Sequence, residues 1–314
     1  MKYNYIISFI VIILCTGCSN QELGKCALHH VGVRYSLLLS QNFPSYDTPC
    51  INPNNGNEFV YRFGDLSADK AWDLVKMNIE TKESEIIYTG FFGNHIQWGP
   101  NDDILLEIRD SLGVNIYSLS SDGSEIEALT NSRFNRAPLW NFDGTKFLYT
   151  IDNIQPPIIK VVDYNSRAVI KEFEFNTSKS LGTWQDKTEE FVYGTTRKGL
   201  VRGSTISGID SLFIEAEEIN DYNSNACFID ENTIFWTHMS GIYVTDLITN
   251  ETALLRESCI TDYYRYPSYS RELDLIVVEK INFHQPNVDE PFVHVTNNIV
   301  TMNTHAGEEN PLLD

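Results

Sequence analysis

Three histidines, His95, His238 and His284, are the side chains of this chain best suited to acid–base or metal chemistry. Imidazole titrates near neutral pH and is the most common metal ligand in proteins. Outside the amino-terminal apolar segment, which ends in Cys15-Thr16-Gly17-Cys18, the chain has neither the His-x-x-x-His nor the Cys-x-x-Cys spacing that would place two ligands on one element. Because scattered histidines are more often surface or packing residues, we expect no metal site and no cofactor unless the fold gathers these three.

A serine nucleophile is not expected either. The elbow motif Gly-x-Ser-x-Gly is absent, and the segment 203–208, Gly-Ser-Thr-Ile-Ser-Gly, has the wrong spacing for it. The sequence therefore predicts no catalytic residue and favours binding over catalysis.

A ligand face is expected in the segments between apolar repeats and in the loops within them. Tyrosine and arginine in these segments are residue types enriched at the energetic centres of interfaces. The alternative is that they pack where neighbouring repeats meet. The candidates are His95, Arg136, Tyr222, Tyr264, Arg265 and His284.

A repeated apolar element must position these candidates. An apolar triad returns six times at intervals of 41 to 45 residues, about the length of four short strands with their turns. That unit is a β-propeller blade. The triads are Phe59–Tyr61, Ile104–Leu106, Phe147–Tyr149, Phe191–Tyr193, Ile234–Trp236 and Leu275–Val277. We therefore predict an all-β fold, a six-bladed β-propeller of four-stranded antiparallel blades.

The second repeat displays the internal order of a blade most clearly. Alternating and β-branched residues predict strands over 96–98, 104–108, 114–119 and 126–129. Between the last two stands Ser-Asp-Gly at 121–123, in which the aspartate bonds to its own backbone and glycine tolerates positive φ. The third repeat restates this order.

The segment 140–149, Trp-Asn-Phe-Asp-Gly-Thr-Lys-Phe-Leu-Tyr, resembles the signature of TolB-type propeller repeats: an aromatic residue, an Asp-Gly turn and an apolar strand. The run 121–131 resembles the end of the same repeat. The resemblance implies a WD-repeat-like ring that binds ligands around the mouth of its central channel. It also implies an alternative, since some TolB-like propellers are metal-dependent polysaccharide lyases with histidines gathered around the channel.

The ends of the ring are less regular than its middle. Residues 310–314 are too few for a full outer strand of the last blade, whereas the segment 33–39 precedes the first repeat. Our hypothesis is that this amino-terminal strand closes the ring, within a propeller domain spanning 31–314. The longest loops, 64–73 and 282–291, belong to the first and sixth repeats, so we expect specific activity there.

The first thirty residues predict export and lipid anchoring. A lysine precedes an apolar run over 6–15 that is too short to cross a bilayer as a helix. The run leads to a Thr-Gly-Cys sequence that resembles the lipobox of bacterial lipoproteins. This resemblance implies a signal peptide over 1–17, diacylglycerol and an acyl chain such as palmitate on Cys18, and a lipidated tail over 18–30. We expect a bacterial cell-envelope location, with the outer membrane favoured and its periplasmic or surface side left open.

The formal charge of −20 argues against nucleic acid and anionic lipid as general partners, because phosphate-binding surfaces need clustered Lys and Arg. Contact with the membrane is therefore expected through the lipid alone. Four cysteines follow the signal, an even number for an oxidising compartment: Cys26, Cys50, Cys227 and Cys259. A Cys26–Cys50 disulfide would tie the tail to the first blade, and buried free thiols are the alternative.

These observations predict a lipid-anchored envelope propeller that is a non-catalytic recognition or scaffold module for a protein or glycan. The alternative is a channel-centred carbohydrate-active enzyme, a metal-dependent lyase or hydrolase. A cluster of His95, His238 and His284 with carboxylates near the axis would favour the enzyme. A channel mouth lined by Tyr and Arg would favour binding.

Overall fold

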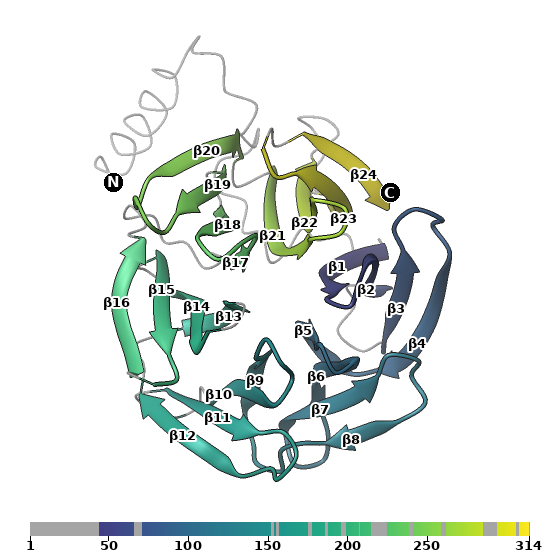
Figure 1. Cartoon of the computed structure of the whole chain (residues 1–314). Coiled ribbons are helices and arrows are strands. Elements are labelled where there is room, and N and C mark those ends of the chain that lie inside the picture. The colour runs from purple at the N-terminus through teal and green to yellow at the C-terminus, as the bar shows by residue number, and fades with distance from the viewer. Residues whose placement is uncertain are drawn as a thin grey trace, which may run out of the picture.

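The computed structural model describes residues 44–313 except 66–70, 152–153, 155–156, 175–177, 186–187, 196–198, 207, 215–224, 239–240, 259–261, 285–293 and 306–307. Every helix or strand assigned in these residues is a strand, and the strands form a ring of blades around a central channel (Figure 1). The predicted fold is confirmed: the chain is an all-β propeller of six four-stranded antiparallel blades.

The four strands of each blade follow one another along the chain, from the channel outward. Blade 1 contains β1 (Pro44–Asn52), β2 (Asn55–Asp65), β3 (Trp72–Asn78) and β4 (Ser84–Gly90). Blade 2 contains β5 (Phe92–Trp98), β6 (Asp103–Arg109), β7 (Val114–Ser120) and β8 (Ile126–Ala128). Blade 3 contains β9 (Asn135–Trp140), β10 (Lys146–Ile151), β11 (Ile158–Asp163) and β12 (Val169–Glu174).

The second half of the ring repeats this order. Blade 4 contains β13 (Ser178–Trp184), β14 (Glu190–Thr195), β15 (Gly199–Ser204) and β16 (Gly208–Ile214). Blade 5 contains β17 (Asn225–Phe228), β18 (Thr233–His238), β19 (Gly241–Asp246) and β20 (Thr252–Glu257). Blade 6 contains β21 (Asp262–Ser270), β22 (Leu275–His284), β23 (His294–Asn303) and β24 (Glu309–Leu313).

The apolar triads lie on the second strand of every blade. Their side chains alternate between the two neighbouring blades: Val60 packs toward blade 2, and Phe59 and Tyr61 pack toward blade 6. A strand buried on both faces needs a continuous apolar run, which explains why the triads dominate the sequence pattern. The sixth triad is Ile276–Val278, one residue later than predicted, because Tyr269 pairs with Ile276 as Trp140 pairs with Phe147.

The last blade is completed by the carboxyl-terminal residues. We expected too few residues there for an outer strand, but Glu309–Leu313 pairs with β23 as β24. Blades 1 and 6 lie side by side and share one parallel bridge, between Ser45 and Asn297. The predicted closing strand over 33–39 lies outside the described residues and remains a hypothesis.

Three of the inner strands contain the same bulge. The register with the second strand shifts after Asp47 in blade 1, after Arg136 in blade 3 and after Arg265 in blade 6. The next residue, Thr48, Ala137 or Tyr266, has a positive φ of about 50°, and a proline follows each. L-residues adopt this conformation reluctantly, so the bulges are held by their surroundings.

Among the described residues, no helix is long and apolar enough to cross a membrane. The predicted signal peptide, Cys18 and the tail over 18–30 fall outside them.

Candidate functional site

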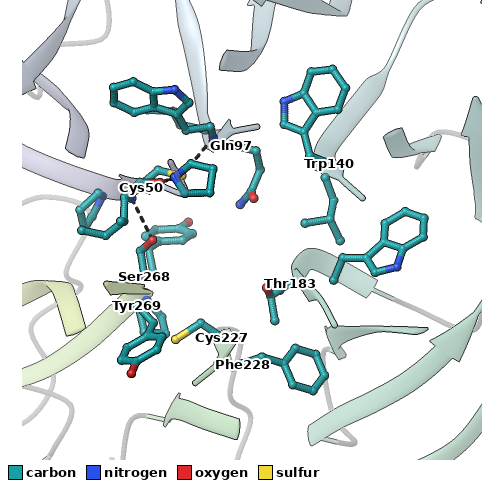
Figure 2. Close-up of a pocket in the computed structure, with 18 of the residues that line it drawn as sticks. Cys50, Gln97, Trp140, Thr183, Cys227, Phe228, Ser268 and Tyr269 are labelled. Atoms are coloured by element: carbon teal, nitrogen blue, oxygen red, sulfur yellow. Dashed lines mark hydrogen bonds between the residues drawn. The ribbon is translucent and has the colours of Figure 1, made fainter. Parts of the chain in front are cut away.

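The inner strands of the blades enclose a cavity of about 690 Å³ on the channel axis. Figure 2 shows uncharged side chains along its wall, contributed by successive blades. They include Cys50, Gln97, Leu139, Thr183, Cys227 and Ser268. The Asp, Glu and Arg residues of the lining, Asp230, Arg271 and Glu272, belong to turns between first and second strands. This part of the channel is therefore close to neutral, with charge at its rim.

Cys50 ties the first two blades together. Its Sγ accepts a hydrogen bond from the backbone N–H of Trp98 at 3.2 Å, and burial raises the pKa of the thiol to about 11. Cys50 and Cys227 are both buried free thiols in this structure. Cys26 lies outside the described residues, so the Cys26–Cys50 disulfide stays a prediction.

Tyr266 also lines this cavity. Its hydroxyl accepts a hydrogen bond from Asn94 Nδ2 at 2.7 Å, so it reaches past blade 1 to blade 2. Its ring meets that of His95 edge-on, with the centroids 6.3 Å apart. Burial raises the pKa of Tyr266, so the hydroxyl keeps its proton and can donate a hydrogen bond to a ligand.

Ionisable side chains of three blades gather next to Tyr266. They lie on the inner strands and on the second strands of these blades. We call this group the charged waist. It comprises Asp47 and Arg62 of blade 1, His95 and Glu107 of blade 2, and Arg265 and Glu279 of blade 6.

In blade 1, Arg62 and Asp47 face each other across the β1–β2 pair. Arg62 donates from Nε to Oδ1 at 2.7 Å and from Nη2 to Oδ2 at 2.6 Å, which is a bidentate pair. Its Nη1 donates to the carbonyl of Phe92 at 3.3 Å, and its guanidinium lies 4.0 Å from the ring centroid of Trp72. The guanidinium is thus fixed on several sides.

In blade 6, the basic residue is on the inner strand and the acidic residue is on the second strand, which is the reverse of blade 1. Arg265, on inner strand β21, donates from Nη2 to Glu279 Oε1 at 2.7 Å, and Asn297 Nδ2 donates to the same oxygen at 3.0 Å. Glu279 is fully buried, yet its Oε2 and the Nε of Arg265 have no hydrogen-bond partner. Burial raises the pKa of Glu279 to about 7, opposed by Arg265 and reinforced by Asp47.

In blade 2, Glu107 holds His95 in place. The distance from His95 Nδ1 to Glu107 Oε1 is 2.7 Å, and the same carboxylate oxygen accepts the backbone N–H of Ala137. Burial alone would raise the pKa of Glu107, but His95, the Ala137 amide and Arg136 lower it below its usual value. Glu107 is therefore a buried anion that joins blades 2 and 3.

The structure brings three of the six predicted ligand-face residues together: His95, Arg136 and Arg265 all lie around the waist. Tyr264 instead lies in the apolar core between blades 5 and 6 and donates its hydroxyl to Glu309 Oε2 at 2.6 Å. Tyr222 lies outside the described residues, and the side chain of His284 is not described. The predicted ligand face is therefore only partly assembled.

The histidines weighed for metal binding sit on different blades. His95 belongs to β5, whereas His238 ends β18, in blade 5. Within the part of the chain that the structure describes, no three His, Cys, Asp or Glu side chains are arranged to hold a metal ion.

Sequence reasoning missed Tyr266 and the four waist charges Asp47, Arg62, Glu107 and Glu279. A signal for part of this site was present. Thr48-Pro49, Ala137-Pro138 and Tyr266-Pro267 occupy equivalent positions in three repeats, directly after a charged residue. Aligning the repeats on these prolines would have drawn attention to Tyr266.

Comparison with known proteins supports the fold and leaves the family open. No protein-family model matches the chain, and no curated protein matches its sequence. TolB from Acinetobacter baumannii has a similar structure, with a TM-score of 0.58 and 15% identity over 85% of this chain and 62% of that one. The chain thus spans less than two thirds of that TolB.

Two further solved structures share the architecture. The β-propeller domain of the Trilobed protease from Pyrococcus furiosus, described as having an open velcro topology, has a TM-score of 0.55 and 12% identity over 87% of this chain and 99% of that one. An oligogalacturonate lyase in complex with manganese has a TM-score of 0.52 and 12% identity over 86% of this chain and 77% of that one. The solved structures, TolB among them, share the β-propeller fold with this chain, and at these identities they speak for the fold alone.

Proposed function

We propose that this propeller is a non-catalytic recognition or scaffold module that binds a protein or glycan partner at the charged waist of its channel. In this proposal a lipid on Cys18 anchors the protein in a bacterial cell envelope, with the outer membrane favoured. The lipobox-like sequence supports the anchor, and mass spectrometry of the mature amino terminus tests it. An unmodified Cys18 would remove that part of the proposal.

One observation carries the binding function. The three waist carboxylates, Asp47, Glu107 and Glu279, are at most 3% exposed. They are enclosed behind their partners, so a ligand in the channel meets the His95 ring and two hydrogen-bond donors, the Tyr266 hydroxyl and the guanidinium of Arg265, whose side chain is 20% exposed. Donors pre-positioned by buried acceptors suit an oxygen-rich ligand such as a glycan or a peptide backbone.

The alternative is a channel-centred carbohydrate-active enzyme, a metal-dependent lyase or hydrolase. The His95–Glu107 pair favours it, because a carboxylate-oriented imidazole is a common general base. The enclosure of Glu279 weighs against it, since an acid that is 0% exposed cannot reach a substrate without rearrangement.

The binding function is tested with the full chain, purified in detergent, on an array of bacterial glycans and by cross-linking capture from envelope extracts. Tyr266→Phe should weaken retention of the ligand about tenfold, the effect of one hydrogen bond. Tyr264→Phe is the matched control, because it removes a hydroxyl from the same strand at a place remote from the channel. Equal retention by wild type and Tyr266→Phe would contradict the proposal.

The enzyme alternative is tested by a separate cleavage assay. Acidic polysaccharides are incubated with the chain and Mn²⁺, and chain cleavage is followed by chromatography. Cleavage that His95→Gln abolishes would replace the binding function with catalysis.

A further inference from the structure

Three large apolar side chains stand exposed at one end of blade 2 and the adjoining edge of blade 3. Phe91 is 53% exposed, Leu112 is 51% exposed and Phe134 is 39% exposed. Phe91 precedes β5, whose start pairs with the end of β6, and Leu112 follows β6. These residues therefore lie at the same end of the blade, the end from which the inner strands enter the ring. We call this group, with the arginines described below, the rim patch.

The two loops that carry Leu112 and Phe134 touch each other. Gly113 packs so closely on the neighbouring loop that a Cβ at this position would lie 3.0 Å from Cγ of Arg133. Gly113 also has a φ of 138°, a conformation that favours glycine. The close approach joins the β6–β7 loop and the β8–β9 segment into one surface.

Hydrogen bonds fix the first of these loops. Asp110 Oδ1 accepts the backbone N–H of Leu112 at 2.7 Å and that of Gly113 at 3.0 Å. Its Oδ2 accepts Asn115 Nδ2 at 2.9 Å and the Tyr117 hydroxyl at 2.8 Å. Leu112 is thus presented by a rigid loop.

The second loop is fixed to the first through buried amides. Asn135 Nδ2 donates to Asn115 Oδ1 at 2.8 Å, to the Ser132 carbonyl at 2.8 Å and to Thr130 Oγ1 at 3.0 Å. Asn115 and Asn135 are both 0% exposed. Phe134 directly precedes Asn135, so its position is set by this network.

Phe134 is held in an unfavourable state in two respects. Its φ is 67°, which is uncommon for a bulky residue, and its ring faces solvent instead of the core. Strained residues that persist because their surroundings over-determine them concentrate at functional sites. A fixed, exposed aromatic residue is also the kind of anchor on which interfaces are built.

The charge around these side chains opposes that of the molecule. Arg109 and Arg133 are exposed, and within the described part of the chain neither forms an ion pair. The chain as a whole has a formal charge of −20. The rim patch therefore combines the three apolar side chains with two arginines and one carboxylate, that of Asp110, on a protein that is acidic as a whole.

We propose that the rim patch is a docking site for an acidic protein segment that carries aromatic or aliphatic side chains between its carboxylates. The arginines meet the carboxylates, and Phe91, Leu112 and Phe134 meet the apolar side chains. A short protein segment fits better than a membrane surface, because an extended anionic bilayer is repelled by the charge of the whole chain, whereas a short segment meets mainly the arginines of the patch. This inference rests on the proposed recognition function and specifies a second contact region of the same module.

The test uses a displayed library of random twelve-residue peptides, selected on the full chain in detergent. We expect the selected peptides to combine two or more Asp or Glu residues with Trp, Phe or Leu. By fluorescence anisotropy they should bind Phe134→Ser at least tenfold more weakly than wild type, and Arg133→Glu should weaken them similarly. Ile126→Ser is the matched control, because Ile126 is a 47% exposed residue of β8 in the same blade, and it should bind like wild type.

Phe134→Gly separates docking from stability. Glycine accepts the positive φ, so this variant should melt at a temperature no lower than wild type while losing peptide binding as Phe134→Ser does. Loss of binding together with a lower melting temperature would assign Phe134 a structural role and overturn the proposal.

Other outcomes also overturn it. The selected peptides could lack acidic residues, or they could bind Phe134→Ser as well as wild type. The selection could also give no enrichment above an uncoated surface. Self-association of the wild type in sedimentation that Phe134→Ser abolishes would make a second copy the occupant. Failure here with intact Tyr266-dependent binding would refute the rim patch alone, whereas the reverse result would refute the waist as the binding site.

Discussion

Blades 1 and 6 carry the same pair of charges in opposite order. In blade 1 the carboxylate of Asp47 is on the inner strand and the guanidinium of Arg62 is on the second strand. In blade 6 the guanidinium of Arg265 is on the inner strand and the carboxylate of Glu279 is behind it. The first pair is bidentate, whereas the second leaves Glu279 Oε2 and Arg265 Nε unpartnered.

The difference separates a structural ion pair from one suited to a ligand. Besides its bidentate pair with Asp47, Arg62 contacts the ring of Trp72 and the backbone of blade 2, so it joins two blades. Arg265 lies over the ring of Tyr266, with its Cζ 5.3 Å from the centroid, and retains an unused donor. The order of the two charges across the strand pair is thus accompanied by a different second contact of the cation, with the neighbouring blade for Arg62 and with the ring of Tyr266 for Arg265.

The largest effect is expected from Asp47→Asn. It leaves the guanidinium of Arg62, 14% exposed, without its carboxylate, and breaking one side of a buried pair costs about 3 to 5 kcal/mol. Urea unfolding followed by tryptophan fluorescence measures the loss. Glu279→Gln at pH 5 should cost less, because Glu279 is then mostly protonated. Equal losses of unfolding free energy in the two variants would contradict the difference between the two ion pairs.

The second effect is a pH dependence confined to blade 6. The pKa of Glu279 is about 7 in the fold against the ordinary 4.5 of a glutamate, so its favourable contribution is full below pH 4.5 and lost as the pH rises to about 7. Relative to Glu279→Gln, the wild type should lose up to about 3 kcal/mol over that range. The difference in unfolding free energy measured at several pH values checks it.

Glu107 supplies the control with the opposite sign. Its pKa is lowered in the fold, so its contribution is present above the ordinary pKa of a glutamate and is lost as the pH falls through the pKa in the folded state. Relative to Glu107→Gln, the wild type should therefore lose stability on acidification. The same direction for both residues would show that the pairs do not differ as described.

A smaller effect is expected at the Asn94–Tyr266 hydrogen bond. A double-mutant cycle with Asn94→Ala and Tyr266→Phe should give a coupling of about 1 kcal/mol in unfolding free energy, the usual net value of such a bond. A coupling near zero would mean that Tyr266 is held by its bulge alone.

The smallest effect concerns the outward side of blade 1. Trp72→Leu removes the ring stacked on Arg62 and should cost about 0.5 to 1 kcal/mol beyond the loss of apolar contact. Trp72→Phe retains an aromatic face and should recover much of this difference. If both variants have the same stability, the cation–π contact contributes nothing to the fixation of Arg62.

The propeller itself was predictable because its main signal is repetitive. Each blade must bury its second strand on both faces, so Phe59, Ile104 and Phe147 fall in nearly the same place of successive repeats. The predicted strand over 114–119 lies within β7, which ends one residue later. The one-residue error at Leu275 arose because Leu275–Val278 is a continuous apolar run, in which only the pairing with β21 defines the register.

The charged waist was less predictable because it is made by contacts between blades. Arg265 was a candidate, but its acid stands fourteen residues later on a strand read only as apolar. Tyr264 was a candidate and Tyr266 was not, because the sequence does not reveal the bulge that turns Tyr266 toward Asn94. A single bulge reverses which of two nearby tyrosines faces the channel and which faces the core.

The two thiols in the channel wall offer a direct view of what enters it. Burial keeps Cys50 protonated at neutral pH, with a pKa of about 11, and raises the pKa of Cys227 further. Since only the thiolate reacts readily, both should alkylate slowly in the empty protein. A molecule that occupies the cavity or loosens its wall would change the rate of alkylation. That rate therefore reports occupancy of the channel without an added label.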